Sequence, residues 1–175
     1  AMKEEFFVLI MGPLFQVLFF YGTSPFLPIR YLSIFTEYHY FILLFNLLPI
    51  YPLDGGRLLQ LLLASLFPFQ KTLRYSIQLS YTALLLLTAF FLTHFSLFFL
   101  FVLGATFLKV REEEKRNPYL FQKFLLERMF YTFSFPKRKI IEEVSDMKKD
   151  TLHLFRKGPI YYTEKEYLTR KKHDF

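Results

Sequence analysis

The chain has 175 residues, with 22 Lys and Arg against 15 Asp and Glu, a formal net charge of +7 and no cysteine. The missing cysteine excludes disulfides, thiolate metal sites and cysteine nucleophiles. Hydrophobic residues make up 53% of the sequence, with 25 Phe and a mean hydropathy of +0.26. This is too apolar for an ordinary soluble domain and indicates a membrane protein.

Charge is concentrated in the last third of the chain. Residues 111–175 hold 16 of the 22 basic and 11 of the 15 acidic residues, a net charge of +5. Beside an apolar region, a basic segment is typical of the cytoplasmic flank of a membrane protein, where it meets anionic lipid. No nucleic-acid recognition motif accompanies this charge, so we expect membrane lipid and no nucleic acid as its partner.

The first apolar run, from Phe6 to Tyr21, predicts a transmembrane helix of about 24 Å that flanking residues extend across the bilayer. Gly12 and Pro13 in its middle, with the lone polar Gln16, indicate either a kink for packing or a functional element. Residues 22–37 predict an interfacial loop on the outer side.

The chain then re-enters the membrane from Tyr38 to about Leu53, and residues 57–67 continue as a short apolar helix. The apolar run 76–110 is too long for one crossing and predicts a helical hairpin. This makes four spans. Basic residues between them place the N-terminus of this chain and the tail in the cytoplasm by the positive-inside rule.

We therefore predict an all-α fold, a polytopic transmembrane helical bundle of about four spans in residues 1–110, followed by a small basic cytoplasmic tail in residues 111–175. Within the tail, Tyr119–Phe133 predicts an amphipathic helix on the membrane or against the bundle. Residues 140–155 predict a strand and a helix.

The stretch Asn46–Arg57, N-L-L-P-I-Y-P-L-D-G-G-R, lies between apolar segments. Insertion of a carboxylate at membrane depth costs about 2.5–3.5 kcal/mol of free energy, so we expect Asp54 to have either a charged partner or a function. Pro49 and Pro52 interrupt a helix. Irregular backbone persists at membrane depth only where protein or a water-filled cavity covers it. The motif predicts a broken transmembrane helix that presents Asp54 to an interior site.

Each polar or irregular residue of this stretch has two interpretations. Asp54 either pairs with Arg57 three residues on, or serves as a divalent-metal ligand or proton site. Asn46 either makes a hydrogen bond between helices or contributes to the site. Pro49 and Pro52 either only kink the helix, or leave carbonyl groups with which an extended peptide can pair.

The histidines do not form a recognisable metal motif. None lies in H-E-x-x-H, which puts two imidazoles and a glutamate on one helix face. His39 and His94 are expected at interfacial outer ends, and His153 and His173 lie in the tail. A single carboxylate cannot hold a catalytic zinc, which usually takes three protein ligands.

Residues 46–57 resemble the N-x-x-P-x-x-P-L-D-G-G-R signature of the site-2 protease family, which are intramembrane zinc metalloproteases. Residues 11–16, Met-Gly-Pro-Leu-Phe-Gln, are similar to the A-G-P-x-x-N element of that family, with Gln16 where Asn is usual. The resemblance implies that Asp54 is the third zinc ligand. It also implies that an unwound substrate segment is held by three residues: Asn46, Pro49 and Pro52.

The tail resembles the sporulation branch of the family, in which a nucleotide-sensing CBS-type segment follows the membrane core. Here the segment is too short for a complete CBS motif, so ATP binding stays open. The family's H-E-x-x-H, expected on a span before Gly12, is missing. Together with the start at Ala1-Met2, this suggests the C-terminal portion of a longer enzyme, with two zinc-binding His and the base Glu upstream.

The resemblance implies an enzyme that cuts a membrane-tethered protein, such as a sporulation sigma-factor precursor, near the cytoplasmic face, with regulatory membrane proteins as further partners. The 175-residue chain alone is expected to be inactive. One alternative is a non-catalytic membrane module that binds a peptide or regulates a partner. Another is an ion or proton carrier, which predicts a second interrupted span that residues 76–110 do not show.

Overall fold

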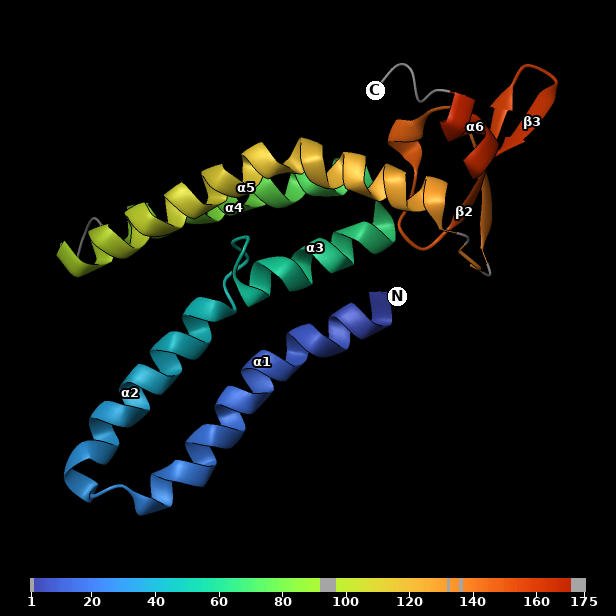
Figure 1. The fold of residues 1–175 in the computed structure, drawn as a ribbon. Coiled ribbons are helices and arrows are strands. Elements are labelled where there is room, and N and C mark those ends of the chain that lie inside the picture. Colours follow the sequence, from blue (N-terminus) through green and yellow to red (C-terminus); the bar gives the residue numbers. More distant parts are fainter. Residues whose placement is uncertain (1, 92–96, 132, 136, 171–175) are drawn as a thin grey trace.

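A computed structural model of the chain describes residues 2–91, 97–131, 133–135 and 137–170. Helices and strands follow one another as α1 (Met2–Thr23), α2 (Ile29–Asn46), α3 (Asp54–Leu66), α4 (Phe69–Phe91), α5 (Leu97–Phe130), β1 (Arg138–Ile141), β2 (Leu152–Lys157), β3 (Ile160–Thr163) and α6 (Glu164–Arg170), with short 3₁₀ turns at Ser24–Phe26 and Val144–Asp146 (Figure 1).

The helical part runs back and forth along one direction. The chain passes down α1, returns through α2 and α3, and passes twice more through the paired helices α4 and α5, with α3 packed against both α1 and α4 (Figure 1). The N-terminus consequently lies at the same end as the tail. This arrangement has the form of the expected helical bundle, with its interruption between α2 and α3.

Within the described residues, only the helical stretch Glu4–Phe26 is long and apolar enough to cross a membrane by itself. The break at residues 47–53 divides the next passage into helices of 18 and 13 residues, each shorter than the roughly 20 that a single span requires. The count of four spans stays a prediction.

The apolar run 76–110 forms the expected pair of antiparallel helices, whose connection at residues 92–96 lies outside the described residues. The helix predicted at Tyr119–Phe133 is present as far as Phe130, but it is not an element of its own. Those residues up to Phe130 belong to α5, a single helix of 34 residues that passes through Pro118 and across the expected boundary at residue 110. The charged segment at its middle, residues 111–116, has high helix propensity, and the helix continues through it and past Pro118.

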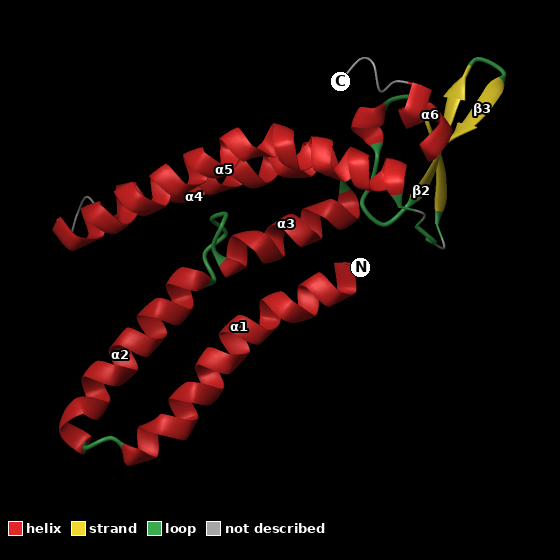
Figure 2. Cartoon of the chain, in the orientation of Figure 1, coloured by secondary structure: helices red, strands yellow, loops and turns green. Residues whose placement is uncertain are grey.

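The all-α prediction is wrong in the tail, which contains a three-stranded sheet (Figure 2). Strand β2 is central, parallel to β1 and antiparallel to β3. The expected helix within residues 140–155 is replaced by a short 3₁₀ turn and the first half of β2. Side chains of β2 alternate, with His153 and Phe155 facing inward, which is the periodicity of a strand.

The tail has a hydrophobic core of its own, to which the end of α5, the sheet and α6 all contribute. Phe155, Met147 and Leu168 are almost completely buried in it, beside Phe124 and Leu125 of α5. The Phe155 ring stacks on Tyr167 with centroids 4.0 Å apart. The last turns of α5 therefore belong to the tail by packing, although they continue a helix of the bundle.

A buried polar network adjoins this core. Nδ1 of His153 lies 2.7 Å from Oε1 of Glu164, and Nε2 of the same ring accepts a hydrogen bond from the backbone N–H of Lys148. The Arg128 guanidinium lies 3.5 Å from the other Glu164 oxygen and donates to the carbonyls of Lys148 and Lys149. Burial lowers the pKa of Arg128, and the nearby carboxylates of Glu164 and others oppose that shift.

The tail is attached to the helical part by residues 146–149. The backbone N–H of Phe69 donates to the Met147 carbonyl at 2.8 Å, and Nζ of Lys148 donates to the Leu66 carbonyl at 2.6 Å. Nζ of Lys149 lies 2.7 Å from Oε1 of Glu5. These contacts keep the beginning of α1 and the turn between α3 and α4 next to the tail.

Candidate functional site

The candidate site lies at the break between α2 and α3. Residues 47–53 form a compact turn, in which the N–H of Ile50 bonds to the Leu48 carbonyl and the N–H of Leu53 to the Ile50 carbonyl. The Ile50 side chain is completely buried in a cluster with α4 and α5. The backbone N–H of Tyr51 donates to the Ser80 hydroxyl of α4 at 2.8 Å. The irregular backbone is therefore covered by protein, as membrane depth requires.

Ser80 is completely buried, and its hydroxyl is fully used. It donates to the Ser76 carbonyl at 2.7 Å while accepting from Tyr51, so this single side chain joins the loop to α4. The sequence analysis missed this role. The signal for it was present, because Ser76 and Ser80 are four residues apart in an apolar helix, where small polar side chains commonly join helices.

The two glycines after Asp54 are required by close backbone approach. A Cβ at Gly55 would lie 2.1 Å from the Leu47 carbonyl oxygen, and one at Gly56 would lie 2.3 Å from the Ile50 carbonyl carbon. Any larger residue would push the loop away from the start of α3. The Gly-Gly pair thus allows the chain to fold back over the N-terminus of this helix.

Asp54 is the first residue of α3 and is half-buried. A Cβ placed on Gly12 of α1 would lie 3.3 Å from Oδ2 of Asp54, so the carboxylate lies against the bare backbone of α1. At this helix end the peptide dipoles favour a negative charge. The Gly12-Pro13 element and the Asp54 motif, far apart in the sequence, therefore lie together.

Asp54 does not pair with Arg57. Within the described residues, neither side chain takes part in an ion pair or a side-chain hydrogen bond, although the two are only three positions apart. The structure therefore disagrees with the first interpretation of Asp54, in which Arg57 neutralises its charge. The carboxylate is left available for a cation.

The other predicted site residues surround the break. Asn46 is the last residue of α2 and is half-buried, as is Pro52, whereas Pro49 is exposed. The carbonyls of Leu48 and Ile50 already accept hydrogen bonds within the turn. The strip is thus turned rather than extended, and a peptide pairing with it would find part of its carbonyl groups in use.

Gln16 of the Gly12-Pro13 element connects α1 to α2, since its amide nitrogen donates to the His39 carbonyl at 3.3 Å. The interfacial position of His39 stays a prediction. Its ring is buried and stacks on Phe20 with centroids 4.2 Å apart, because an imidazole is flat enough to pack in an aromatic cluster. His94 and His173 lie outside the described residues.

In the part of the chain that the structure describes, no three His, Asp or Glu side chains form a group that could hold a metal. His153 is engaged with Glu164 in the tail. Asp54 by itself fits one position of a zinc site, which usually takes three protein ligands. The described residues therefore cannot hold a zinc without further donors.

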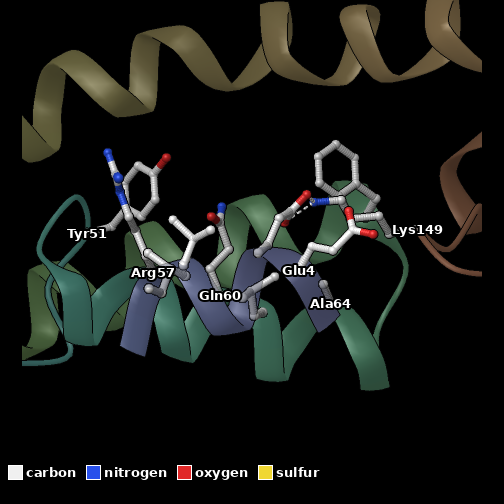
Figure 3. A pocket seen from close by; sticks show the side chains of 11 residues that line it. Glu4, Tyr51, Arg57, Gln60, Ala64 and Lys149 are labelled. Atoms are coloured by element: carbon white, nitrogen blue, oxygen red, sulfur yellow. Dashed lines mark hydrogen bonds and ion pairs between the residues drawn. The ribbon is translucent and has the colours of Figure 1, made fainter. Parts of the chain in front are cut away.

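A cavity of about 380 Å³ begins beside the break and follows the groove between α1 and α3. Tyr51 and Arg57 line it at one end, Gln60 in the middle, and Glu4 and Lys149 at the other end (Figure 3). Apolar residues of α1, among them Val8, form the opposite wall. The groove leads from the neighbourhood of Asp54 to the tail.

Comparison with known proteins agrees with the motif. Residues 20–90, which contain α2, the break, α3 and nearly all of α4, match Peptidase family M50. The resemblance to site-2 proteases, expected from residues 46–57, is thereby confirmed. The Gly12-Pro13 element lies before the matched residues.

One relative of the M50 domain extends the likeness beyond it. The chain is 38% identical over 138 residues to stage IV sporulation protein FB of Bacillus subtilis (strain 168), an alignment that covers 74% of this chain and 47% of that protein. The chain thus spans about half the length of this relative. Since the alignment is longer than the M50 match, part of the likeness lies outside residues 20–90.

Proposed function

We propose that this chain is the C-terminal portion of an intramembrane zinc metalloprotease that cuts a membrane-tethered protein near the cytoplasmic face. The observation that carries the proposal is the position of Asp54. It starts α3, lies against Gly12 and makes no ion pair within the described residues. The M50 match supports the proposal independently.

In this proposal Asp54 is one zinc ligand, and two histidines come from a part of the protein outside these residues. A zinc so held lowers the pKa of a bound water. The residues of this chain hold the site in place. Ser80 and Ile50 anchor the loop, Gly12 leaves room for the carboxylate, and the Asn46 amide offers a donor and an acceptor to a substrate backbone.

The substrate segment is proposed to bind at Asn46, Pro49 and Pro52. Helix-breaking residues there leave the carbonyls of Pro49 and Tyr51 outside the hydrogen bonds of the turn, so the substrate can pair with them. The likeness to a sporulation protein supports a role in sporulation. Within that role we propose a sigma-factor precursor as substrate and regulatory membrane proteins as partners.

The test is Asp54→Asn in the full-length protein, with zinc content, membrane insertion and cleavage measured together. The neutral amide is a poor zinc ligand, so zinc and cleavage should both be lost while insertion is unchanged. The matched control is Asp146→Asn. Asp146 of the tail forms an exposed pair with Lys71 of α4, so this variant should leave both zinc and cleavage intact. Retained cleavage by Asp54→Asn contradicts the ligand role.

The alternative of a non-catalytic peptide-binding module is favoured by one observation: the described residues bring a single metal donor to the break. A full-length protein that binds no zinc, yet binds a membrane-tethered peptide at Asn46, would support this alternative.

Orientation can be tested in the same protein. We propose that the N-terminus of this chain and the tail are cytoplasmic. Because this chain has no cysteine, a Lys149→Cys variant can be labelled without background once any cysteine outside these residues has been replaced. A membrane-impermeant thiol reagent should reach it only from the cytoplasmic side. Labelling from the opposite side would contradict the proposed topology.

A further inference from the structure

Of the charged residues that line the groove between α1 and α3, Arg57 is the one next to the break. Arg57 lies one turn into α3, is exposed toward the groove and makes no ion pair within the described residues. A cation at membrane depth costs about 2.5–3.5 kcal/mol when it lacks a partner. Asp54 is not that partner, although it lies on the same helix.

The other charges of the groove lie at its far end. Glu5 is paired with Lys149 there, and Glu4 lies beside them (Figure 3). The middle is lined by the neutral Gln60 and by the small Ala64. A chain lying in the groove would therefore meet Arg57 as the charge nearest the site, with the far end already occupied by an ion pair.

We infer that Arg57 selects an acidic residue of the substrate close to the cut bond, with Gln60 as a neighbouring hydrogen-bonding group. This inference rests on the proposed function and adds a specificity determinant to it. A substrate carboxylate would supply the partner that Arg57 lacks, through a charge-assisted hydrogen bond that a planar guanidinium makes well.

The distance along the groove limits where that acidic residue can be. Three residues of α helix advance about 4.5 Å, and an extended chain advances about 3.3 Å per residue. A substrate held beside Asp54 and leaving along α3 would therefore pass Arg57 within about two residues. The acidic residue is expected in the first two positions on one side of the cut bond.

The experiment uses the full-length protein and a reporter with one transmembrane segment. Asp, Asn and Lys are placed in turn at each of the two positions on either side of the cut bond. When the substituted position is on one particular side of the cut bond, the wild-type protein should cleave the Asp reporter about tenfold faster than the Lys reporter. This factor is expected for a hydrogen bond to a charged group. Equal cleavage of the two overturns the inference and leaves the proposed function intact.

Variants of Arg57 identify the residue responsible. Arg57→Glu should reverse the preference toward Lys, and Arg57→Gln should abolish the preference while still cleaving the Asn reporter. The matched control is Arg74→Glu, because Arg74 is an exposed cation of α4 that lines a different cavity. It should keep the wild-type preference.

Three further outcomes oppose the inference. An unchanged preference in both Arg57 variants overturns it. The inference is also overturned if cleavage by Arg57→Gln no longer depends on anionic lipid while the preference for the Asp reporter is intact. In that case the Arg57 guanidinium would bind a lipid headgroup. Failure of the wild-type protein to cut any reporter overturns the proposed function, and this inference with it.

Discussion

The helical bundle and the tail bury their side chains in different ways. On α1, Phe15 is 70% exposed and Phe7 61% exposed, whereas Phe155 and Met147 in the tail are completely buried. The bundle leaves many of its large apolar side chains exposed, and it is held together by a small apolar cluster around Ile50 and by small polar contacts, such as Tyr51 with Ser80. The tail has a packed core and a buried charge network, as a water-soluble domain has. A Phe→Ala substitution should therefore cost much more stability in the tail than on the exposed face of α1.

The sharpest test of this difference is a pair of Phe→Ala variants. Phe155→Ala should destabilise the tail by about 3–5 kcal/mol, the usual cost of removing a buried phenylalanine. Phe15→Ala should change stability little, because that side chain faces outward. Amide hydrogen exchange of the tail in both variants measures the effect. Equal losses in the two would mean that α1 has a covered face in the native protein.

Within the bundle, the glycines of the break should be the most sensitive positions. Gly55→Ala places a methyl group 2.1 Å from the Leu47 carbonyl oxygen, so the loop must move, at a cost at the upper end of about 1–3 kcal/mol or beyond. Thermal unfolding in detergent measures it. Gly104→Ala is the control, since a Cβ there meets nothing within 4 Å. A Gly55→Ala variant as stable as Gly104→Ala would show that the loop is not held against α3.

Removal of the Ser80 hydroxyl should have a smaller effect. Ser80→Ala leaves the buried N–H of Tyr51 without an acceptor and should cost about 1–3 kcal/mol. Thr82→Ala is matched to it, because the Thr82 hydroxyl also bonds the carbonyl four residues earlier but is exposed. The two are compared by unfolding and by proteolysis at residues 47–53. Equal behaviour of the pair would contradict the anchoring role of Ser80.

The smallest effect is expected at the start of α6, from pH. The backbone N–H of Thr163, and then its hydroxyl, lower the pKa of Glu166 by bonding its carboxylate. The folded-state pKa lies below the unfolded value, so the stabilisation is present above the ordinary Glu pKa and is lost as pH falls through the lowered one. Exchange of the Thr163 amide between pH 6 and about pH 3 should reveal this loss.

The control for this titration is Glu166→Gln, which cannot ionise. Its Thr163 amide should be equally protected at both pH values. A wild-type amide whose protection does not change with pH would contradict the capping contact.

The sequence was sufficient for the break and for the helical nature of the apolar runs, but not for the helix bounds: α2 already begins at Ile29, within the predicted loop 22–37, and α5 continues to Phe130. Long apolar runs have one way to satisfy their backbone in lipid, and Pro49 and Pro52 within such a run interrupt it locally. The motif at Asn46–Arg57 predicted the family, because a carboxylate, prolines and paired glycines at membrane depth rarely occur together without a shared function. The tail sheet was missed because strands of four to six residues carry little periodic signal.

Tertiary structure alone decided which residues meet at the break. Gly12 and Asp54 are 42 positions apart, and only the antiparallel packing of α1 on α3 brings the carboxylate against bare backbone. Likewise, an Asp and an Arg three positions apart can pair on a helix, and only the direction of each side chain shows that these two do not. The local sequence pattern determines the backbone conformation, because the interactions that set it act between residues close in the sequence. The partners of a charge depend on packing between distant segments, which no short stretch of sequence contains.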